Sequence, residues 1–160
     1  MILRGVALML FAMPVAAAAQ MAPNCPWFTT GSAAKLLGSD VSVEAHVNAD
    51  RDGSCRFVRG TGATAQAIEI AIGKIDSHIC PAGSTNLKTL GNQAMQCRRS
   101  MSGGRNAETI AGRMRDIYFV VTMIGVPDAT RSPTSGLHTS DDFGASPLER
   151  AAEQVVGNLY

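Results

Sequence analysis

The sequence has no marked excess of charge of either sign. Its 160 residues contain 14 lysines and arginines against 13 aspartates and glutamates, a formal net charge of +1. Arg4 lies in the segment that we expect to be removed, and +1 minus that one charge leaves zero. Domains that bind nucleic acids usually carry a clustered basic excess. The composition therefore argues against a nucleic-acid partner.

Aromatic residues are also scarce, at 5% of the chain with a single tryptophan. This is too few to predict a platform for stacking carbohydrates. Trp27 lies close to Cys25 in the sequence, and we expect it to pack against a disulfide.

Sequence motifs of catalysis and cofactor binding are missing. The chain has no Walker loop, dinucleotide fingerprint, HExxH or Gly-x-Ser-x-Gly. Its three histidines, His46, His78 and His138, are scattered, and Asp141-Asp142 is a carboxylate pair within an expected loop. We therefore predict no catalytic residues, no cofactor and no enzymatic activity. His46 or His78 beside a carboxylate and a serine or threonine in a cleft would favour an enzyme instead.

Asn48-x-Asp50-x-Asp52-Gly53 resembles the start of a calcium-binding loop. Such a loop needs a glutamate at its twelfth position, which here is Arg59. An Asp-Gly hairpin turn explains the same residues. Neither a C-x-x-C motif nor a cysteine–histidine cluster with zinc spacing occurs, so we predict no metal site.

What the chain does have begins with an export signal. Arg4 precedes an apolar run over 5–15, and small residues over 16–19 suit cleavage after Ala19. The run is shorter than the roughly 20 apolar residues that span a bilayer. Cys25 follows Ala-Pro-Asn, a poor context for lipid attachment. We expect residues 1–19 to be a signal peptide and residues 20–160 a single periplasmic or secreted domain without a membrane anchor.

Four cysteines remain after the signal: Cys25, Cys55, Cys80 and Cys97. An even number in an exported chain predicts disulfides, and four cysteines allow three pairings. We favour Cys25–Cys55 with Cys80–Cys97, because local pairing avoids crossed links.

The hydrophobic pattern predicts an α+β domain in which an antiparallel sheet of about six strands carries an N-terminal and a C-terminal helix on one face. The expected helices are 29–38 and 146–159, and the expected strands are 41–47, 54–59, 67–75, 91–100, 107–114 and 117–126. The strand 117–126 is the most apolar, which predicts a place inside the sheet. Residues 76–87 have no regular pattern. Residues 127–145, rich in Pro, Ser, Thr, Gly and Asp, predict a mobile loop.

Five arginines are concentrated in one stretch: Arg98, Arg99, Arg105, Arg113 and Arg115. We favour a solvated face of a strand pair. The alternative is an anion-binding site formed by Arg98, Arg99, Arg113 and Arg115.

Several short motifs suggest a family. They are Cys25, Lys35-Leu-Leu-Gly38, Ser54-Cys-Arg-Phe57, Leu90-Gly-Asn-Gln-Ala94, Arg113-Met-Arg-Asp-Ile-Tyr-Phe119 and Ala152-Glu-Gln-Val-Val-Gly-Asn-Leu159. This series resembles small secreted or lipid-anchored bacterial domains of unknown function, which are similar to extracellular sensor domains of bacterial Ser/Thr kinases. The resemblance implies an α+β sandwich with paired cysteines and a role in binding or sensing.

The functional expectation is a non-catalytic periplasmic or secreted binding module for an unknown small molecule or envelope protein. Such a module should present a concave apolar pocket between the sheet and the helices, or an exposed apolar patch. The alternative is a secreted inhibitor of a cell-envelope enzyme, with the segment between Cys80 and Cys97 as its rigid loop.

Overall fold

A computed structural model describes residues 24–73, 80–81, 84–88, 90, 93–125 and 145–160. The expected signal peptide lies outside the described residues. So does the expected mobile loop 127–145, apart from Ala145. His78, His138, Asp141 and Asp142 fall in these undescribed segments as well.

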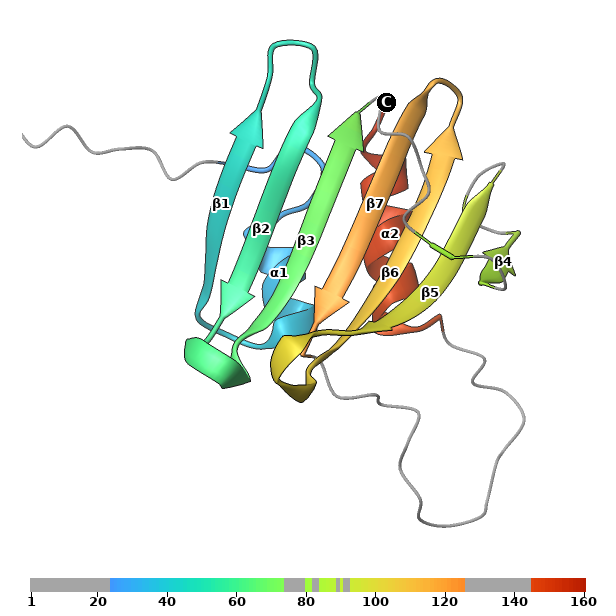
Figure 1. Cartoon of the computed structure of the whole chain (residues 1–160). Coiled ribbons are helices and arrows are strands. Elements are labelled where there is room, and N and C mark those ends of the chain that lie inside the picture. The colour runs from blue at the N-terminus through green and yellow to red at the C-terminus, as the bar shows by residue number, and fades with distance from the viewer. Residues whose placement is uncertain (1–23, 74–79, 82–83, 89, 91–92, 126–144) are drawn as a thin grey trace, which may run out of the picture.

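The core of the fold is one antiparallel sheet of seven strands in the order β1-β2-β3-β7-β6-β5-β4 (Figure 1). Its strands are β1 (Val41–Val47), β2 (Gly53–Arg59), β3 (Gln66–Gly73), β4 (Thr85–Leu87), β5 (Ala94–Ser100), β6 (Asn106–Met114) and β7 (Ile117–Ile124). Short 3₁₀ turns, η1 (Gly62–Thr64) and η2 (Ser102–Gly104), follow β2 and β5. Strands β1 to β3 form one meander and β4 to β7 another, and the two meet where β3 pairs with β7.

Strand β7 occupies the middle of this order, which confirms the prediction from its apolar sequence. Its alternate residues Phe119 and Val121 are buried in the main core together with Ile68 and Ile70 of β3. Since side chains alternate along a strand, these residues place the core on one face of the sheet.

The sheet has seven strands where about six were expected. The additional strand is β4, which lies within the segment 76–87 that was predicted to be irregular. Its residues Thr-Asn-Leu carry no alternating hydrophobic pattern, so no local signal marks them. The backbone pairing of Asn86 with Met95 on β5 defines the strand instead.

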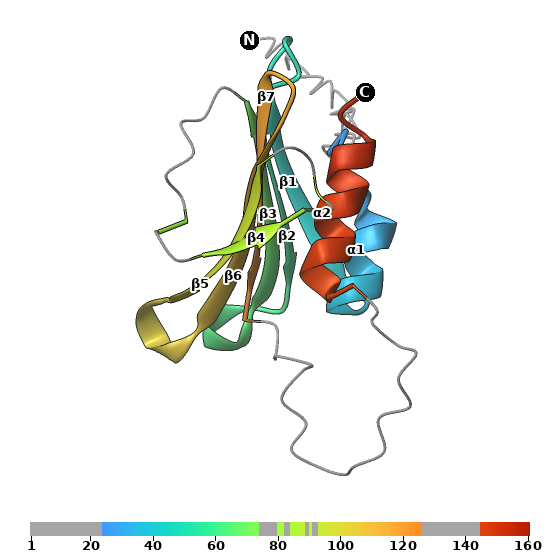
Figure 2. The same ribbon diagram turned by 90° about the vertical axis from the view of Figure 1, so that its right-hand side faces the viewer.

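One helix precedes the strands in the sequence and one follows them. Helix α1 (Thr30–Leu37) begins at Thr29, whose side chain accepts a hydrogen bond from the Ser32 amide. Helix α2 (Pro147–Gly157) begins with a capping box between Ser146 and Glu149, as the sequence indicated. Figure 2 shows both helices on the same side of the sheet. Among the described residues, no helix combines the length and apolar character that a bilayer crossing needs.

The helices bury their apolar residues in the same core as β3 and β7. Helix α1 contributes Ala33 and Leu37, and α2 contributes Leu148, Ala151, Ala152 and Val155. Ser32 and Gln154 join the two helices directly, because the Gln154 Nε2 donates to the Ser32 Oγ at 2.8 Å.

Two disulfides link the chain with the favoured pairing, Cys25–Cys55 and Cys80–Cys97. The first joins the segment before α1 to β2, and Cys55 is buried in the core beside Trp27. The second joins Cys80 to β5, within the second meander.

Candidate functional site

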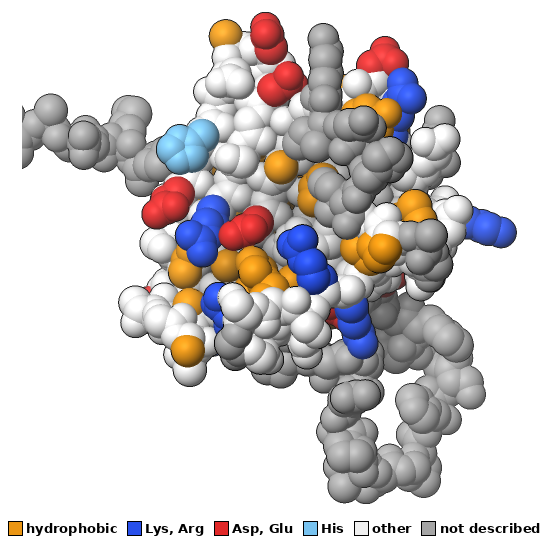
Figure 3. Space-filling view, in the orientation of Figure 1, with side chains coloured by type: hydrophobic (Ala, Val, Ile, Leu, Met, Phe, Trp, Pro, Cys, Tyr) orange, Lys and Arg blue, Asp and Glu red, His pale blue; other side chains and the backbone are white. Residues whose placement is uncertain are grey.

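The face of the sheet that points away from the helices, here called the outer face, carries the side chains that alternate with the core residues. It includes Ser42, Glu44 and His46 on β1, Ser54, Arg56 and Val58 on β2, Ala67, Glu69 and Ala71 on β3, Tyr118, Val120, Thr122 and Ile124 on β7, Ala107, Thr109, Ala111 and Arg113 on β6, and Met95, Cys97 and Arg99 on β5. Figure 3 looks onto this face and shows acidic and basic side chains interleaved over β1, β2 and β3.

The outer face changes character from one side to the other. On β1 and β2 it is mostly polar and exposed, whereas on β6 and β7 it includes the buried residues Ala107, Thr109, Ala111, Val120 and Thr122. The hydroxyls of Thr109 and Thr122 satisfy each other at 3.0 Å.

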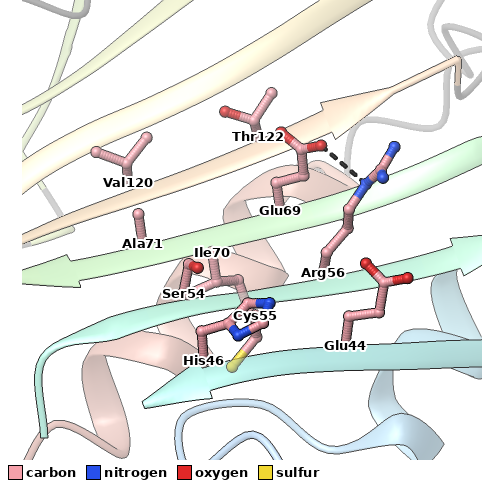
Figure 4. A pocket seen from close by; sticks show the side chains of 10 residues that line it. All are labelled: Glu44, His46, Ser54, Cys55, Arg56, Glu69, Ile70, Ala71, Val120 and Thr122. Carbon is pink, nitrogen blue, oxygen red and sulfur yellow. Dashed lines mark ion pairs between the residues drawn. The ribbon is translucent and has the colours of Figure 1, made fainter. Parts of the chain in front are cut away.

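On the outer face, over β1, β2, β3 and β7, lies a half-open hollow of about 320 Å³. Its lining residues come from four strands: Glu44 and His46 of β1, Ser54, Cys55 and Arg56 of β2, Glu69, Ile70 and Ala71 of β3, and Val120 and Thr122 of β7 (Figure 4). Small-molecule sites in proteins usually enclose about 300–1,000 Å³. The hollow is therefore large enough for a small ligand.

Three charged side chains cross the hollow as a row, because Arg56 pairs in register with Glu44 on one side and Glu69 on the other. The Arg56 Nε lies 3.1 Å from the Glu69 Oε1, and Figure 4 shows Arg56 between the two carboxylates. Both members of this ion pair are about half exposed, at 53% and 44%, so water screens it. Glu44 makes no ion pair or hydrogen bond with any other described residue. The row thus carries one unneutralised carboxylate.

His46 and Ser54 lie opposite each other on β1 and β2, next to Glu44 along the same face. The structure thereby brings a histidine, a hydroxyl and a carboxylate to one hollow, the combination that would favour an enzyme. However, no hydrogen bond joins the Ser54 hydroxyl to the His46 ring among the described interactions. Both residues are exposed, so the serine is neither activated nor shielded from water.

The residues that resemble a calcium loop form the turn that aligns β1 with β2. The Asn48 amide donates to the Asp52 carbonyl at 2.8 Å, and Arg51 and Gly53 have positive φ angles of 62° and 151°. A Cβ at position 53 would lie 2.0 Å from the His46 carbonyl oxygen, so only glycine fits there. The predicted hairpin turn is confirmed, and it fixes which residues of β1 and β2 face each other.

The arginines considered as an anion site are not gathered at one place. Arg98 and Arg99 follow each other on β5 and therefore point to opposite faces of the sheet. Arg98 pairs with Glu108. Glu108 lies five positions along β6 from Arg113, a separation of about 17 Å at the usual rise of a strand.

At the far end of β6 the remaining arginines contact aromatic rings and a carboxylate. Arg113 lies 3.4 Å from Asp116 and stacks over Tyr118, with its guanidinium carbon 5.3 Å from the ring centre. Arg115 stacks over Tyr160 at 4.5 Å. The contact between Arg115 and Tyr160 connects the β6–β7 turn to the residues that follow α2.

Neither a family model nor a curated protein nor a solved structure matches this chain. The resemblance to sensor domains stays a prediction, and the candidate site depends on the geometry alone.

The sequence predicted a concave apolar pocket between the sheet and the helices, whereas the hollow lies on the opposite face and has charged side chains in its lining. One sequence signal nevertheless pointed to part of it. Glu44 and His46 alternate with apolar residues on one predicted strand, and Ser54 and Arg56 do so on the next. Once the Asp52-Gly53 turn is accepted, these four side chains must share one face. The contribution of β3 and β7 has no such local signal.

Proposed function

We propose that this protein is an extracytoplasmic binding module that holds a small polar ligand in the hollow on the outer face of β1, β2, β3 and β7. One observation carries the proposal: the row Glu44, Arg56 and Glu69 lines a hollow of about 320 Å³. Strands hold such a row more rigidly than loops would, because their backbones are fixed by pairing on both sides. Strand β2, which carries Arg56, and strand β3, which carries Glu69, each pair with a neighbouring strand on both sides.

The charges of the hollow favour a cationic group on the ligand. Arg56 neutralises Glu69, whereas Glu44 has no partner among the described residues. A primary amine or guanidinium placed beside Glu44 would complete the row of alternating charges. Ala71 and Val120 supply the small apolar surface on which the carbon skeleton of such a ligand can rest. The ligand class is therefore a small amine or guanidine with a short apolar part.

Binding is a better use of this site than catalysis. A serine nucleophile needs a base that takes its proton and donors that stabilise the resulting oxyanion. Ser54 has no hydrogen bond to His46, and the amides of paired strands are used within the sheet. We expect an activated ester such as p-nitrophenyl acetate to be hydrolysed equally by the protein and by its Ser54→Ala variant. A loss of hydrolysis in that variant would establish an enzyme instead.

The disulfides support the proposed compartment. Both pairs are formed, and disulfides persist in oxidising environments such as the periplasm or the extracellular space. Periplasmic or secreted localisation is thus part of the proposal. Expression with the native N-terminus, followed by fractionation and mass determination, tests it; a mature protein beginning at Gln20 is expected.

The ligand class is tested by differential scanning fluorimetry with agmatine, putrescine and arginine as cationic probes and glutarate as an anionic probe, all at one ionic strength. A ligand that binds only the folded protein raises its melting temperature in proportion to the logarithm of its concentration. We expect the cationic probes to stabilise the protein and glutarate to have no effect. Glu44→Gln should lower the apparent affinity for the cationic probes at least tenfold, which appears as a smaller rise in melting temperature.

A second variant separates binding in the hollow from nonspecific attraction to charge. Ala71→Ile adds side-chain volume inside the hollow, while Ser42→Ile adds the same side chain on the outer face away from it. We expect Ala71→Ile to abolish the response and Ser42→Ile to keep it. Equal responses from both variants would overturn the proposal.

A further inference from the structure

Strand β1 forms one edge of the sheet, and no described residue pairs with its free side (Figure 1). The other edge, β4, is only three residues long, whereas β1 has seven residues paired one to one with β2, without a bulge. Monomeric proteins usually protect such an edge with charged side chains, especially lysine, with proline or with a bulge. The sequence Val-Ser-Val-Glu-Ala-His-Val has no lysine, no proline and no bulge, and Glu44 is its one acidic residue.

The turn identifies which backbone groups of β1 are free. The Asn48 amide donates to Asp52 on the neighbouring side of the hairpin. Backbone groups alternate in direction along an antiparallel strand. The even-numbered residues of β1 therefore bond to β2, and the odd-numbered residues point their amides and carbonyls outward. The outward set is Val41, Val43, Ala45 and Val47.

The side chains of Val47, Glu44 and His46 on β1 are exposed at this edge. Val47 is 39% exposed and is one of two large hydrophobic residues that are exposed in the described part of the chain. On the outer face, Glu44 and His46 make no hydrogen bond or ion pair with other described residues. The free edge thus carries one exposed apolar side chain, Val47, one carboxylate, Glu44, and one imidazole, His46.

A second copy of β1 fits this edge in an antiparallel register centred on Ala45. Ala45 would then pair with Ala45 of the second copy through its outward amide and carbonyl. On the outer face, Glu44 would face His46 of the second copy, and the reverse contact would form as well. On the helix side, Val43 would cover the exposed Val47. Centring the pairing on Glu44 instead would place two carboxylates opposite each other, which is unfavourable.

We infer that this protein forms a homodimer in which two β1 strands pair antiparallel about Ala45, held by reciprocal Glu44–His46 contacts. The two sheets become one continuous sheet, related by a twofold axis normal to it, so that both outer faces point the same way. Figure 1 shows α1 behind β2 and β3 rather than beyond the free side of β1. The contact between carboxylate and imidazole is attractive whether the ring is protonated or donates a neutral N–H.

The first test is sedimentation velocity on the oxidised protein over concentrations from micromolar to millimolar. We expect a reversible equilibrium between monomer and dimer. Ala45→Pro removes an outward amide that makes no bond inside the sheet, and proline is tolerated on edge strands. This variant should be monomeric, with the buried-tryptophan emission of the native fold. A wild-type protein that stays monomeric throughout would overturn the inference.

The second test reverses charges on exposed side chains and so leaves the fold intact. Glu44→Lys places a cation opposite His46, and His46→Glu places a carboxylate opposite Glu44. Because each contact occurs twice in the dimer, each single variant should weaken dimerisation by about tenfold or more. The double variant restores opposite charges and should recover the affinity to within about threefold. A dimer that is insensitive to all four variants uses another surface, and the inference fails.

Glu44 serves both the hollow and this edge, so the two proposals need separate readouts. Ala71→Ile blocks the hollow without touching the edge, and Ala45→Pro blocks the edge without lining the hollow. A wild-type protein that dimerises but binds none of the cationic probes would refute only the proposed ligand site, and one that binds them but stays monomeric would refute only the inferred dimer.

Discussion

Gly112 and Phe119 face each other across β6 and β7, and the ring of Phe119 covers the α-carbon of Gly112. A Cβ at position 112 would lie 2.6 Å from the Phe119 Cζ and 3.1 Å from the Ala94 Cβ. Phe119 is completely buried, so its ring cannot swing into solvent. We expect Gly112→Ala to lower the free energy of unfolding by about 1–3 kcal/mol. Urea unfolding followed by the emission of Trp27, the single tryptophan, measures this change.

Gly157, at the end of α2, provides the matched control. No heavy atom lies within 4 Å of the position that its Cβ would occupy. Gly157→Ala should therefore stabilise the protein by about 0.5–1 kcal/mol, because alanine loses less backbone freedom on folding. Equal destabilisation by both substitutions would show that packing under Phe119 is not the cause.

The two disulfides should contribute unequally to stability. Cys25–Cys55 spans 30 residues and fastens the segment with the buried Trp27 and Phe28 to β2. Replacing both of its cysteines by alanine should cost about 3–4 kcal/mol. The same change at Cys80–Cys97, which spans 17 residues, should cost about 3 kcal/mol or less. Melting temperatures of the two double variants test the order, and a greater loss at Cys80–Cys97 would contradict it.

The capping box of α2 predicts that removing the Ser146 hydroxyl lowers the stability of the protein measurably. The Glu149 amide donates to the Ser146 Oγ at 3.1 Å, and the Ser146 amide donates to the Glu149 Oε2 at 2.7 Å. Ser146→Ala leaves the first of these amides without its acceptor and should cost about 1 kcal/mol. Ser146→Asp keeps an acceptor at the same place and should retain most of the stability. Thermal unfolding monitored by circular dichroism separates the two variants.

Asn158 connects the end of α2 to the segment before α1. Its Nδ2 donates to the Trp27 carbonyl at 3.0 Å, at a partly buried position. Asn158→Ala leaves that carbonyl without this donor and should cost about 1–2 kcal/mol. Asn158→Asp preserves the size of the side chain but replaces the donor by an acceptor, so it should be at least as harmful. A neutral result for Asn158→Asp would mean that the contact contributes nothing to folding.

Much of the fold follows from local sequence signals. The hydrophobic pattern predicted six strands, five of them within two residues of their observed bounds, and the Ser146–Glu149 box predicted the start of α2. Alternating apolar residues marked 41–47, and a continuous apolar run marked 117–126. These signals work because a strand with one buried face and a helix end with unsatisfied amides each impose a pattern on neighbouring residues.

The site was not predictable in the same way. Glu44 and Thr122 line one hollow although 78 positions separate them (122 minus 44), and only the pairing of β3 with β7 brings them together. That pairing skips three strands of the chain, and no local pattern reports it. The same holds for β4, whose three residues depend on their neighbour β5 for pairing.

The junction of β3 with β7 also determines how the oxidised chain can assemble. Cys25 and Cys55 both precede β3 in the sequence, and Cys80 and Cys97 both follow it. Neither disulfide therefore links the first meander to the second. Each half can thus be locked covalently while the halves are still apart. The two halves are held together by the backbone pairing of β3 with β7, by apolar contacts and by the hydrogen bond from Gln154 to Ser32. Folding of the oxidised chain would then be the docking of two separately cross-linked halves, and we expect pairing across the centre of the sheet to be its slow, long-range step.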